Sequence, residues 1–351
     1  MAKINKKIRL TYFSMIFLLL LGACEKEFSV NSENTEPFPI IYALLNPSDD
    51  VHYVKVFKSF LVEGNAYDVV NDINKYSYID SIDVYLVEYD GNGNNIRTIE
   101  FYSTTEVPKD SGLFGYPTQI IYKADAELNM NYTYQLFVHN PYTKNIACNE
   151  KPIVLAGQSS LVESSTKTTI AIPENSMTMK FFAGINSTKY LLRIWYYYSE
   201  DLTDNTSRQP DPILWTIGTV SGSLSTAKTE KTLTIGSGSD FFRRVASEVV
   251  EDPNVYRRRT DSLVYEIYSA AHDWDLYIQS TAPSTGLNQN KLYYSNLKAY
   301  NTETGEEKYV MGFVSSRAIL MRQYRDLAYP ATRDSLINGR FTKHLKFTDN
   351  Y

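Results

Sequence analysis

The residues best able to carry metal or nucleophilic chemistry are few in this 351-residue chain, which holds two cysteines and four histidines. A zinc site needs ligands spaced so that their side chains converge on one ion. The histidines instead stand singly, at His52, His139, His272 and His344. Only His272 lies in an acidic cluster, His272-Asp273-Trp274-Asp275, which a solvated helix face or cap explains more simply. We therefore expect no metal and no cofactor, and we assign no catalytic residue.

Two glycine-bearing segments match only part of a ligand-binding pattern. Residues 90–94 (Asp-Gly-Asn-Gly-Asn) place oxygens as in the start of a calcium loop, but Asn95 and Phe101 stand where that loop needs Gly and Glu. Residues 236–239 (Gly-Ser-Gly-Ser) could present backbone N–H groups to a phosphate, yet no Lys-Ser or Lys-Thr follows them. We interpret the first as a hairpin turn and the second as a loop that leads into a helix. A Gly-x-Ser-x-Gly nucleophile turn is missing from the sequence.

The first 24 residues have the layout of an export signal. Four positive charges, at Lys3, Lys6, Lys7 and Arg9, precede an apolar run over residues 10–21 that is too short to span a membrane as a helix. The run ends in Leu-Gly-Ala-Cys at 21–24, which resembles the bacterial lipobox, where the signal is cleaved before a cysteine that carries lipid. We therefore predict a signal peptide over 1–23, cleavage between Ala23 and Cys24, and membrane anchoring by acyl chains on Cys24. The alternative is an ordinary signal peptide with a chance cysteine.

Cleavage at this site would change both the charge and the cysteine inventory. The formal net charge of −5 would become −9, because residues 1–23 contain four positive charges and no acid. An acidic surface of this size argues against nucleic acid and against an anionic membrane face as partners. With Cys24 lipidated, Cys148 would have no partner for a disulfide within the chain. Its apolar neighbours Ile146 and Ala147 predict a buried, inert thiol.

Residues 24–38 have the composition of a tether. Glu25-Lys26-Glu27 directly follows the predicted lipidation site and is similar to the surface-export signal of Bacteroidetes lipoproteins. Residues 28–38 are rich in Ser, Asn and Glu, which is typical of a flexible linker. We therefore predict an acylated flexible tether on the outer membrane, with the body exposed at the cell surface.

The body of the chain follows the period of two that β-strands produce. Ile82, Val84 and Leu86 alternate with more polar residues, and the strand stops at the turn residues 90–94. Seven such segments fit between residues 39 and 157, which predicts an N-terminal β-sandwich-like domain. A Ser/Thr-rich stretch after Gly157 then marks a boundary near residue 158.

The C-terminal domain, predicted over 158–351, is β-rich with short helices. Strands are expected at 177–182, 190–198, 263–268 and 309–314. One helix is expected after a cap at Ser239 or Asp240 and before the stop at Pro253, because apolar residues recur there at helical spacing, at Phe241, Phe242, Val245 and Val249. A second short helix is expected over 270–278. The fold class expected is all-β, with two β-sandwich-like domains and one or two short helices in the C-terminal half.

The most conspicuous compositional feature is the aromatic content, with 29 tyrosines in the chain. Most of them fall inside period-two strands, where core packing explains them. The cluster Trp195, Tyr196, Tyr197 and Tyr198 is a possible face for a ligand or partner, although a strand turns alternate side chains to opposite faces. Arginines at 243–244 and 257–259 form a second possible patch, for an anion or a partner.

Several segments together resemble the DUF4249 family of Bacteroidetes outer-membrane lipoproteins. They are the lipobox and acidic tether, the strands at 41–47, 53–60 and 80–89, and the late segments 267–269, 294–296 and 312–314. The chain departs from the family pattern at 296–300, where the usual glycine is missing. The resemblance assigns no reaction and no functional residue. Because members are often encoded beside TonB-dependent outer-membrane receptors, it implies an accessory role at the cell surface.

These observations lead to one functional expectation and two alternatives. We expect a cell-envelope lipoprotein of the outer membrane that binds a ligand or a receptor protein, associated with a TonB-dependent uptake complex. The alternatives are a surface hydrolase acting on glycan or peptide, and an envelope scaffold. Asp-Ser-aliphatic triplets at 80–82, 261–263 and 334–336 also resemble the O-glycosylation acceptor motif of Bacteroidetes.

Overall fold

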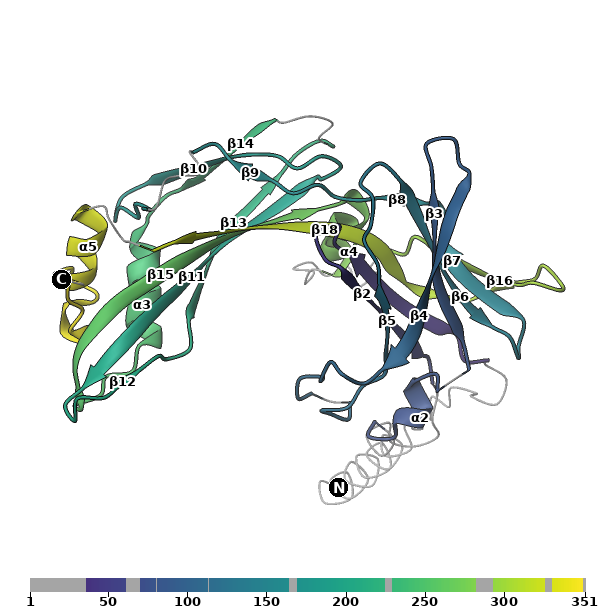
Figure 1. Cartoon of the computed structure of the whole chain (residues 1–351), viewed down its shortest axis with the longest axis horizontal. Coiled ribbons are helices and arrows are strands. Elements are labelled where there is room, and N and C mark those ends of the chain that lie inside the picture. The colour runs from purple at the N-terminus through teal and green to yellow at the C-terminus, as the bar shows by residue number, and fades with distance from the viewer. Residues whose placement is uncertain are drawn as a thin grey trace, which may run out of the picture. The chain divides into compact units, whose positions relative to one another are not determined.

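The computed structural model describes residues 36–60, 70–79, 81–112, 114–163, 169–224, 229–281, 293–325 and 330–349 (Figure 1). The predicted signal peptide, Cys24 and most of the predicted tether lie outside these residues. The described chain is mostly strands, with its helices mainly in the C-terminal half, so the all-β, sandwich-like prediction is confirmed. None of the described helices is long and apolar enough to cross a membrane.

A first hydrophobic core is enclosed by strands that follow one another in a mostly antiparallel order. Their bounds are β1 (Pro39–Leu45), β2 (Val51–Lys58), β3 (Asp83–Tyr89), β4 (Asn95–Thr104), β5 (Ile121–Asp125), β6 (Thr133–Asn140), β7 (Asn145–Asn149), β8 (Ile153–Val154), β16 (Leu297–Asn301) and β17 (Glu307–Lys308). The period of two in the sequence fixes which side chains enter this core. In β1, for example, Ile41 and Ala43 are buried while Tyr42 between them points to the opposite face.

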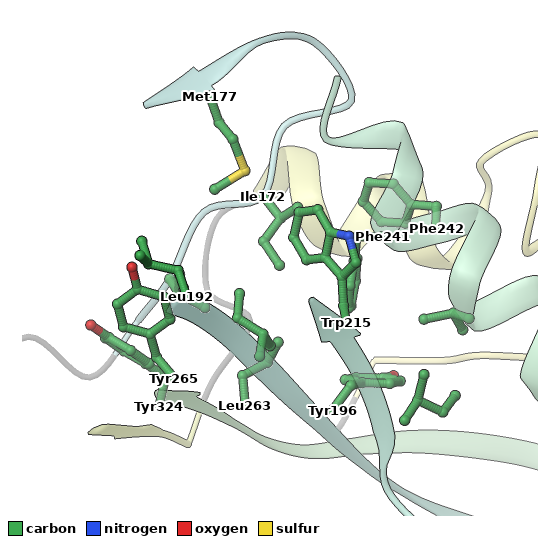
Figure 2. Close-up of a cluster of buried hydrophobic side chains, with 14 of the residues drawn as sticks. Ile172, Met177, Leu192, Tyr196, Trp215, Phe241, Phe242, Leu263, Tyr265 and Tyr324 are labelled. Carbon is green, nitrogen blue, oxygen red and sulfur yellow. The ribbon is translucent and has the colours of Figure 1, made fainter. Parts of the chain in front are cut away.

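A second core lies between one face of a large sheet, a three-stranded sheet and a helix (Figure 2). The large sheet includes β11 (Lys189–Leu202), β12 (Ser207–Arg208), β13 (Ile213–Ser221) and β15 (Val255–Ala270). The three-stranded sheet is formed by β9 (Ser160–Leu161), β10 (Met177–Phe182) and β14 (Glu230–Ile235). Tyr196 of β11 and Trp215 of β13 both pack against Phe241 of the helix, with ring centroids 5.5 and 5.7 Å from it. Aromatic side chains therefore supply much of this core.

The long strand β18 (Met311–Tyr324) belongs to both cores. Its first half pairs in parallel with β1, from Met311 beside Ile40 to Ser316 beside Leu45. Its second half pairs antiparallel with β15. The parallel pairing is close at Gly312, where a Cβ atom would lie 1.8 Å from the carbonyl oxygen of Ile41, so a side chain has no room there.

The division of the chain between the two cores differs from the predicted domain limits. The last residue of the first core before the Ser/Thr-rich stretch is Leu155, and the second core begins at Ile170. However, β16 pairs with β7, and Leu297, Ala299 and Val314 pack in the first core. A segment that the sequence assigned to the C-terminal domain thus returns to the N-terminal one. The local sequence pattern predicts that a segment is a strand, but it does not show which strand that segment pairs with.

Both predicted helices are present. They are α3 (Ser239–Glu248), which buries Phe241, Phe242 and Val245, and α4 (His272–Thr281). The predicted cap is wrong, because the N-cap residue of α3 is Gly238, and the Ser239 hydroxyl instead donates to the carbonyl of Glu174. Sequence patterns missed the short elements α2 (Ile73–Tyr76), α5 (Pro330–Ile337) and η3 (Lys343–Leu345). One or two turns are too short to display a helical period.

Candidate functional site: an aromatic pocket with a cationic rim

The predicted aromatic face at 195–198 is divided between the two sides of β11. Tyr196 (0% exposed) and Tyr198 are buried in the second core, where the Tyr196 hydroxyl lies 2.9 Å from Oγ1 of Thr260. On the other side, Trp195 is half-buried and Tyr197 is 38% exposed. The four rings therefore do not form one platform. The other predicted site residues, Ala23 and Cys24, lie outside the described residues.

The predicted arginine patch is neutralised by carboxylates within the fold. Arg258, which is only 1% exposed, donates to Oε1 of Glu200 at 2.7 Å. Arg257 and Arg259 both donate to Asp201. A hydrogen bond from the Ser207 hydroxyl, together with these two arginines, holds the pKa of Asp201 well below its usual range. Arg243 and Arg244 likewise pair with acids one turn away on α3.

These ion pairs account for the buried charge at this end of the large sheet. Arg258 also donates to the carbonyls of Val250 and Leu345, so one guanidinium joins β15, the segment after α3 and the C-terminal η3. Arg208 contacts Glu200 and Asp252 from the solvent side. Because each charge has partners, we interpret the arginine cluster as a structural network that ties the C-terminus to the sheet.

The titratable groups considered above do not converge on a catalytic or metal site. Within the described ranges, no group of three His, Cys, Asp or Glu side chains could hold a metal ion. The ring of His52 is buried against the carbonyl of Ala126, and burial lowers its pKa. The Asp90 carboxylate accepts hydrogen bonds from the backbone N–H groups of Asn92 and Asn94, as aspartate typically does in a turn. Burial raises the pKa of the Cys148 thiol, in agreement with the inert thiol that the sequence predicted.

The triplet at 261–263, one of three that resemble an O-glycosylation acceptor, is not available for modification. The hydroxyl-bearing Ser262 is buried in β15 and accepts a hydrogen bond from Gln323. A sugar cannot be added to this serine without unfolding the sheet around it.

A pocket that the sequence patterns did not reveal lies on the outer face of β1 and β2. Its volume is about 370 Å³, within the range of small-molecule sites. Five aromatic side chains and one aliphatic pair dominate its walls, together with a few polar groups. The lining residues are Ile40, Tyr42, Phe57, Lys58, Ser59, Phe60, Tyr76, Ser77, Lys109, Phe114, Gln119 and Ile120. We call this site the aromatic pocket.

The strand alternation of β1 and β2 builds the floor of the aromatic pocket. Since Ile41 and Val56 point into the first core, their neighbours Ile40, Tyr42 and Phe57 must point outward. Ile40 lies directly beside Phe57 in the antiparallel register of the two strands. The Tyr42 and Phe57 rings then meet edge to face, with centroids 6.4 Å apart.

The side walls come from α2 and from the segment between β4 and β5. Asp72 caps α2 by accepting from the backbone N–H of Asn74, and the helix presents Tyr76 to the pocket. The ring of Phe114 lies edge to face with Tyr76 and with Phe60, at centroid distances of 5.4 and 6.2 Å. Three rings from three segments therefore hold one another in place around an open volume.

Helix α4 supports the floor from the side of β18. Tyr277 of α4 stacks on Phe313 at 4.2 Å between centroids and meets the edge of Tyr42 at 6.0 Å. The Tyr42 hydroxyl lies 3.5 Å from that of Tyr293, and burial raises the pKa of Tyr42 above its usual range. The phenol therefore stays protonated at neutral pH and gives the apolar floor one neutral polar group.

Lysines lie at the edge of the pocket, and among the described residues they form no ion pair with an acid. Lys55 donates to Oε1 of Gln119 at 2.6 Å and lies 4.7 Å above the Phe57 ring. Lys109 donates to the carbonyls of Phe114 and Gly115. Burial and the nearby charge of Lys109 lower the pKa of Lys55. Among the described residues, neither Lys55 nor Lys109 forms an ion pair with a carboxylate.

Comparison with known proteins adds little to this picture. No protein-family model matches the chain, and no curated protein matches it by sequence. Among solved structures, the C-terminal globular domain of an oligosaccharyltransferase from Pyrococcus abyssi is 13% identical over 65% of this chain and 46% of its own, with a TM-score of 0.24. Trypsin-activated alpha-2-macroglobulin from Escherichia coli is 8% identical over 81% of this chain and 15% of its own, with a TM-score of 0.16. The chain thus spans less than half the length of either protein, and similarity this low carries no argument about function.

Proposed function

We propose that the chain is a lipid-anchored protein of the outer membrane that binds a small, largely apolar ligand as an accessory to a TonB-dependent uptake complex. The aromatic pocket is the observation that carries the binding part of this proposal. The lipobox-like residues 21–24 support the anchor. The resemblance to the DUF4249 family supports the receptor partner.

The composition of the aromatic pocket favours binding over catalysis. Its described lining combines five rings with lysines, a glutamine and serines, and contains no carboxylate and no histidine. Hydrolysis of a glycan needs a pair of carboxylates, and acyl transfer needs a base beside the nucleophile. Flat apolar walls with a few polar groups are instead typical of a site that holds a ligand unchanged. Nothing in the described part of the chain specifically favours the hydrolase or the scaffold.

A fluorescence titration with the neutral probe N-phenyl-1-naphthylamine tests the pocket. We expect saturable binding of one probe per protein, because the rings exclude water from the bound aromatic body. Ile40→Trp should abolish this binding, since the larger side chain fills the floor of the pocket. Thr216→Trp is the matched control, because Thr216 is exposed on β13 and does not line the pocket. Equal binding by all three proteins would overturn the proposal.

The partner is tested separately, with the full-length lipidated protein. We expect an outer-membrane receptor to co-purify with the protein from detergent-solubilised membranes, identified by mass spectrometry. Cys24→Ala should abolish acyl labelling and release the protein from the membrane fraction, because the anchor depends on that one thiol. Recovery of no receptor contradicts the accessory role, and continued acyl labelling of the variant contradicts the lipobox.

A further inference from the structure

We propose that the aromatic pocket selects small organic anions, in which a flat apolar body fills the ring-lined volume and an acidic group meets Lys55 and Lys109. This inference rests on the proposed binding function and names the class of ligand. The walls of the pocket suit any apolar molecule, whereas the charged side chains described at its rim are positive.

The walls alone do not discriminate between ligands of different charge. Rings from Phe57, Tyr76 and Phe114 offer apolar and edge contacts that a neutral molecule satisfies as well as a charged one. Discrimination must therefore come from the polar groups at the rim.

The rim is cationic and incompletely satisfied. Lys109 lines the pocket directly, and Lys55 is hydrogen bonded to Gln119, which also lines it. The hydrogen bonds of these two ammonium groups go to neutral oxygens, those of a side-chain amide and of backbone carbonyls. Each ammonium has three N–H donors, so an incoming anion finds donors in addition to charge. Two neighbouring lysines without a described carboxylate partner repel each other, and a bound anion relieves that repulsion.

Another lysine of the same sheet, Lys123, is paired with an acid. Lys123 of β5 lies 2.9 Å from Oε1 of Glu106, which also accepts from the Tyr53 hydroxyl at 2.8 Å. Lys123 is therefore neutralised by an acid, whereas Lys55 and Lys109 have no carboxylate partner among the described residues. This difference is what a site for an anion requires.

Two probes that differ only in a sulfonate provide the test. N-phenyl-1-naphthylamine is neutral, and 8-anilinonaphthalene-1-sulfonate is the same body with an acidic group. We expect the sulfonate to bind the wild-type protein at least as tightly as the neutral probe. Lys55→Gln and Lys109→Gln should each weaken the sulfonate about five- to tenfold and change the neutral probe less than about twofold. Lys151→Gln, at an exposed site outside the pocket, should leave both affinities unchanged.

Competition assays add an independent readout. We expect 2-naphthoate to displace the bound sulfonate at lower concentration than 2-naphthylmethanol, in which the carboxylate is replaced by a neutral group. If the alcohol competes equally, or if the lysine variants weaken both probes alike, the selection of anions is overturned while the apolar pocket stands. If neither probe binds the wild-type protein and Ile40→Trp makes no difference, the binding function fails and the selection fails with it.

Discussion

At the residue scale, Lys55 is the position where ligand binding and stability oppose each other. Its ammonium group is half-buried, faces the charge of Lys109 and has no described carboxylate partner. Such a group is costly to keep in the folded protein, because burial disfavours the charged form. Its described partners are the neutral oxygen of Gln119 and the Phe57 ring, and a buried charge without a carboxylate partner is a candidate for a functional role.

Replacing Lys55 by an uncharged residue should stabilise the folded protein at neutral pH. Because the folded state lowers the pKa of Lys55, the unfolded chain binds more protons, and stability rises with pH between the two pKa values. We therefore expect Lys55→Met to raise Tm at pH 7 by about 2 °C and to differ less from wild type near pH 10.5. Thermal unfolding followed by circular dichroism at the two pH values measures this. A variant several degrees less stable than wild type at pH 7 would contradict it.

The sequence pattern is sufficient to predict the direction of a side chain where a single strand determines it. The division of Tyr196 and Tyr198 from Tyr197 between the two faces follows from alternation within β11 alone, although alternation does not show which face is buried. The aromatic pocket was not predictable in the same way, because its rings come from β1, β2, α2 and the segment before β5. The available signal was Tyr42, an aromatic residue on the outward side of a strand whose neighbours Ile41 and Ala43 are buried.

At the scale of elements, the pairing of Arg258 with Glu200 determines how the C-terminus is held. Arg258 projects from β15, Glu200 from β11, and the accepting carbonyl of Leu345 belongs to η3. The sequence showed these arginines as a run of like charge and could not show their partners. Glu200 lies about 60 residues away in the sequence and meets Arg258 only because β11 and β15 are neighbours in the sheet.

Removing the buried guanidinium of Arg258 should therefore destabilise the folded protein. We expect Arg258→Met to lower the free energy of unfolding by about 3–5 kcal/mol, because it leaves Glu200 buried with one partner fewer. Urea unfolding at pH 7 gives this value. Arg243→Met, which removes an exposed ion pair with Asp240, is the control and should change the free energy by less than about 1 kcal/mol. Equal effects of the two substitutions would show that the buried network does not hold the C-terminus.

At the scale of the whole molecule, β18 makes the two cores dependent on each other. The strand is paired with β1 in one half and with β15 in the other, and β16 extends the sheet beyond β7. The two-sandwich description was predictable from strand periodicity and the Ser/Thr-rich boundary. The return of residues 297–316 to the first core was not, because a parallel pair that joins the first and last long strands leaves no local pattern.

A fragment limited to residues 39–157 should accordingly not fold by itself. It lacks the strands that supply Leu297, Ala299 and Val314 to the first core, and its β1 would lose the partner strand along one edge. We expect such a fragment to show no cooperative thermal transition and poorly dispersed amide resonances. A cooperative transition with well-dispersed resonances would mean that the first core is independent of β18.

Titration of N-phenyl-1-naphthylamine into the wild-type protein, Ile40→Trp and Thr216→Trp decides whether the aromatic pocket holds a ligand. The pocket is about 370 Å³, and Ile40 lines its floor, whereas Thr216 is exposed elsewhere. We expect one saturable site in the wild-type protein and in Thr216→Trp, and none in Ile40→Trp, with all three proteins folded by circular dichroism. A site that persists unchanged in folded Ile40→Trp would show that the probe does not bind in the aromatic pocket.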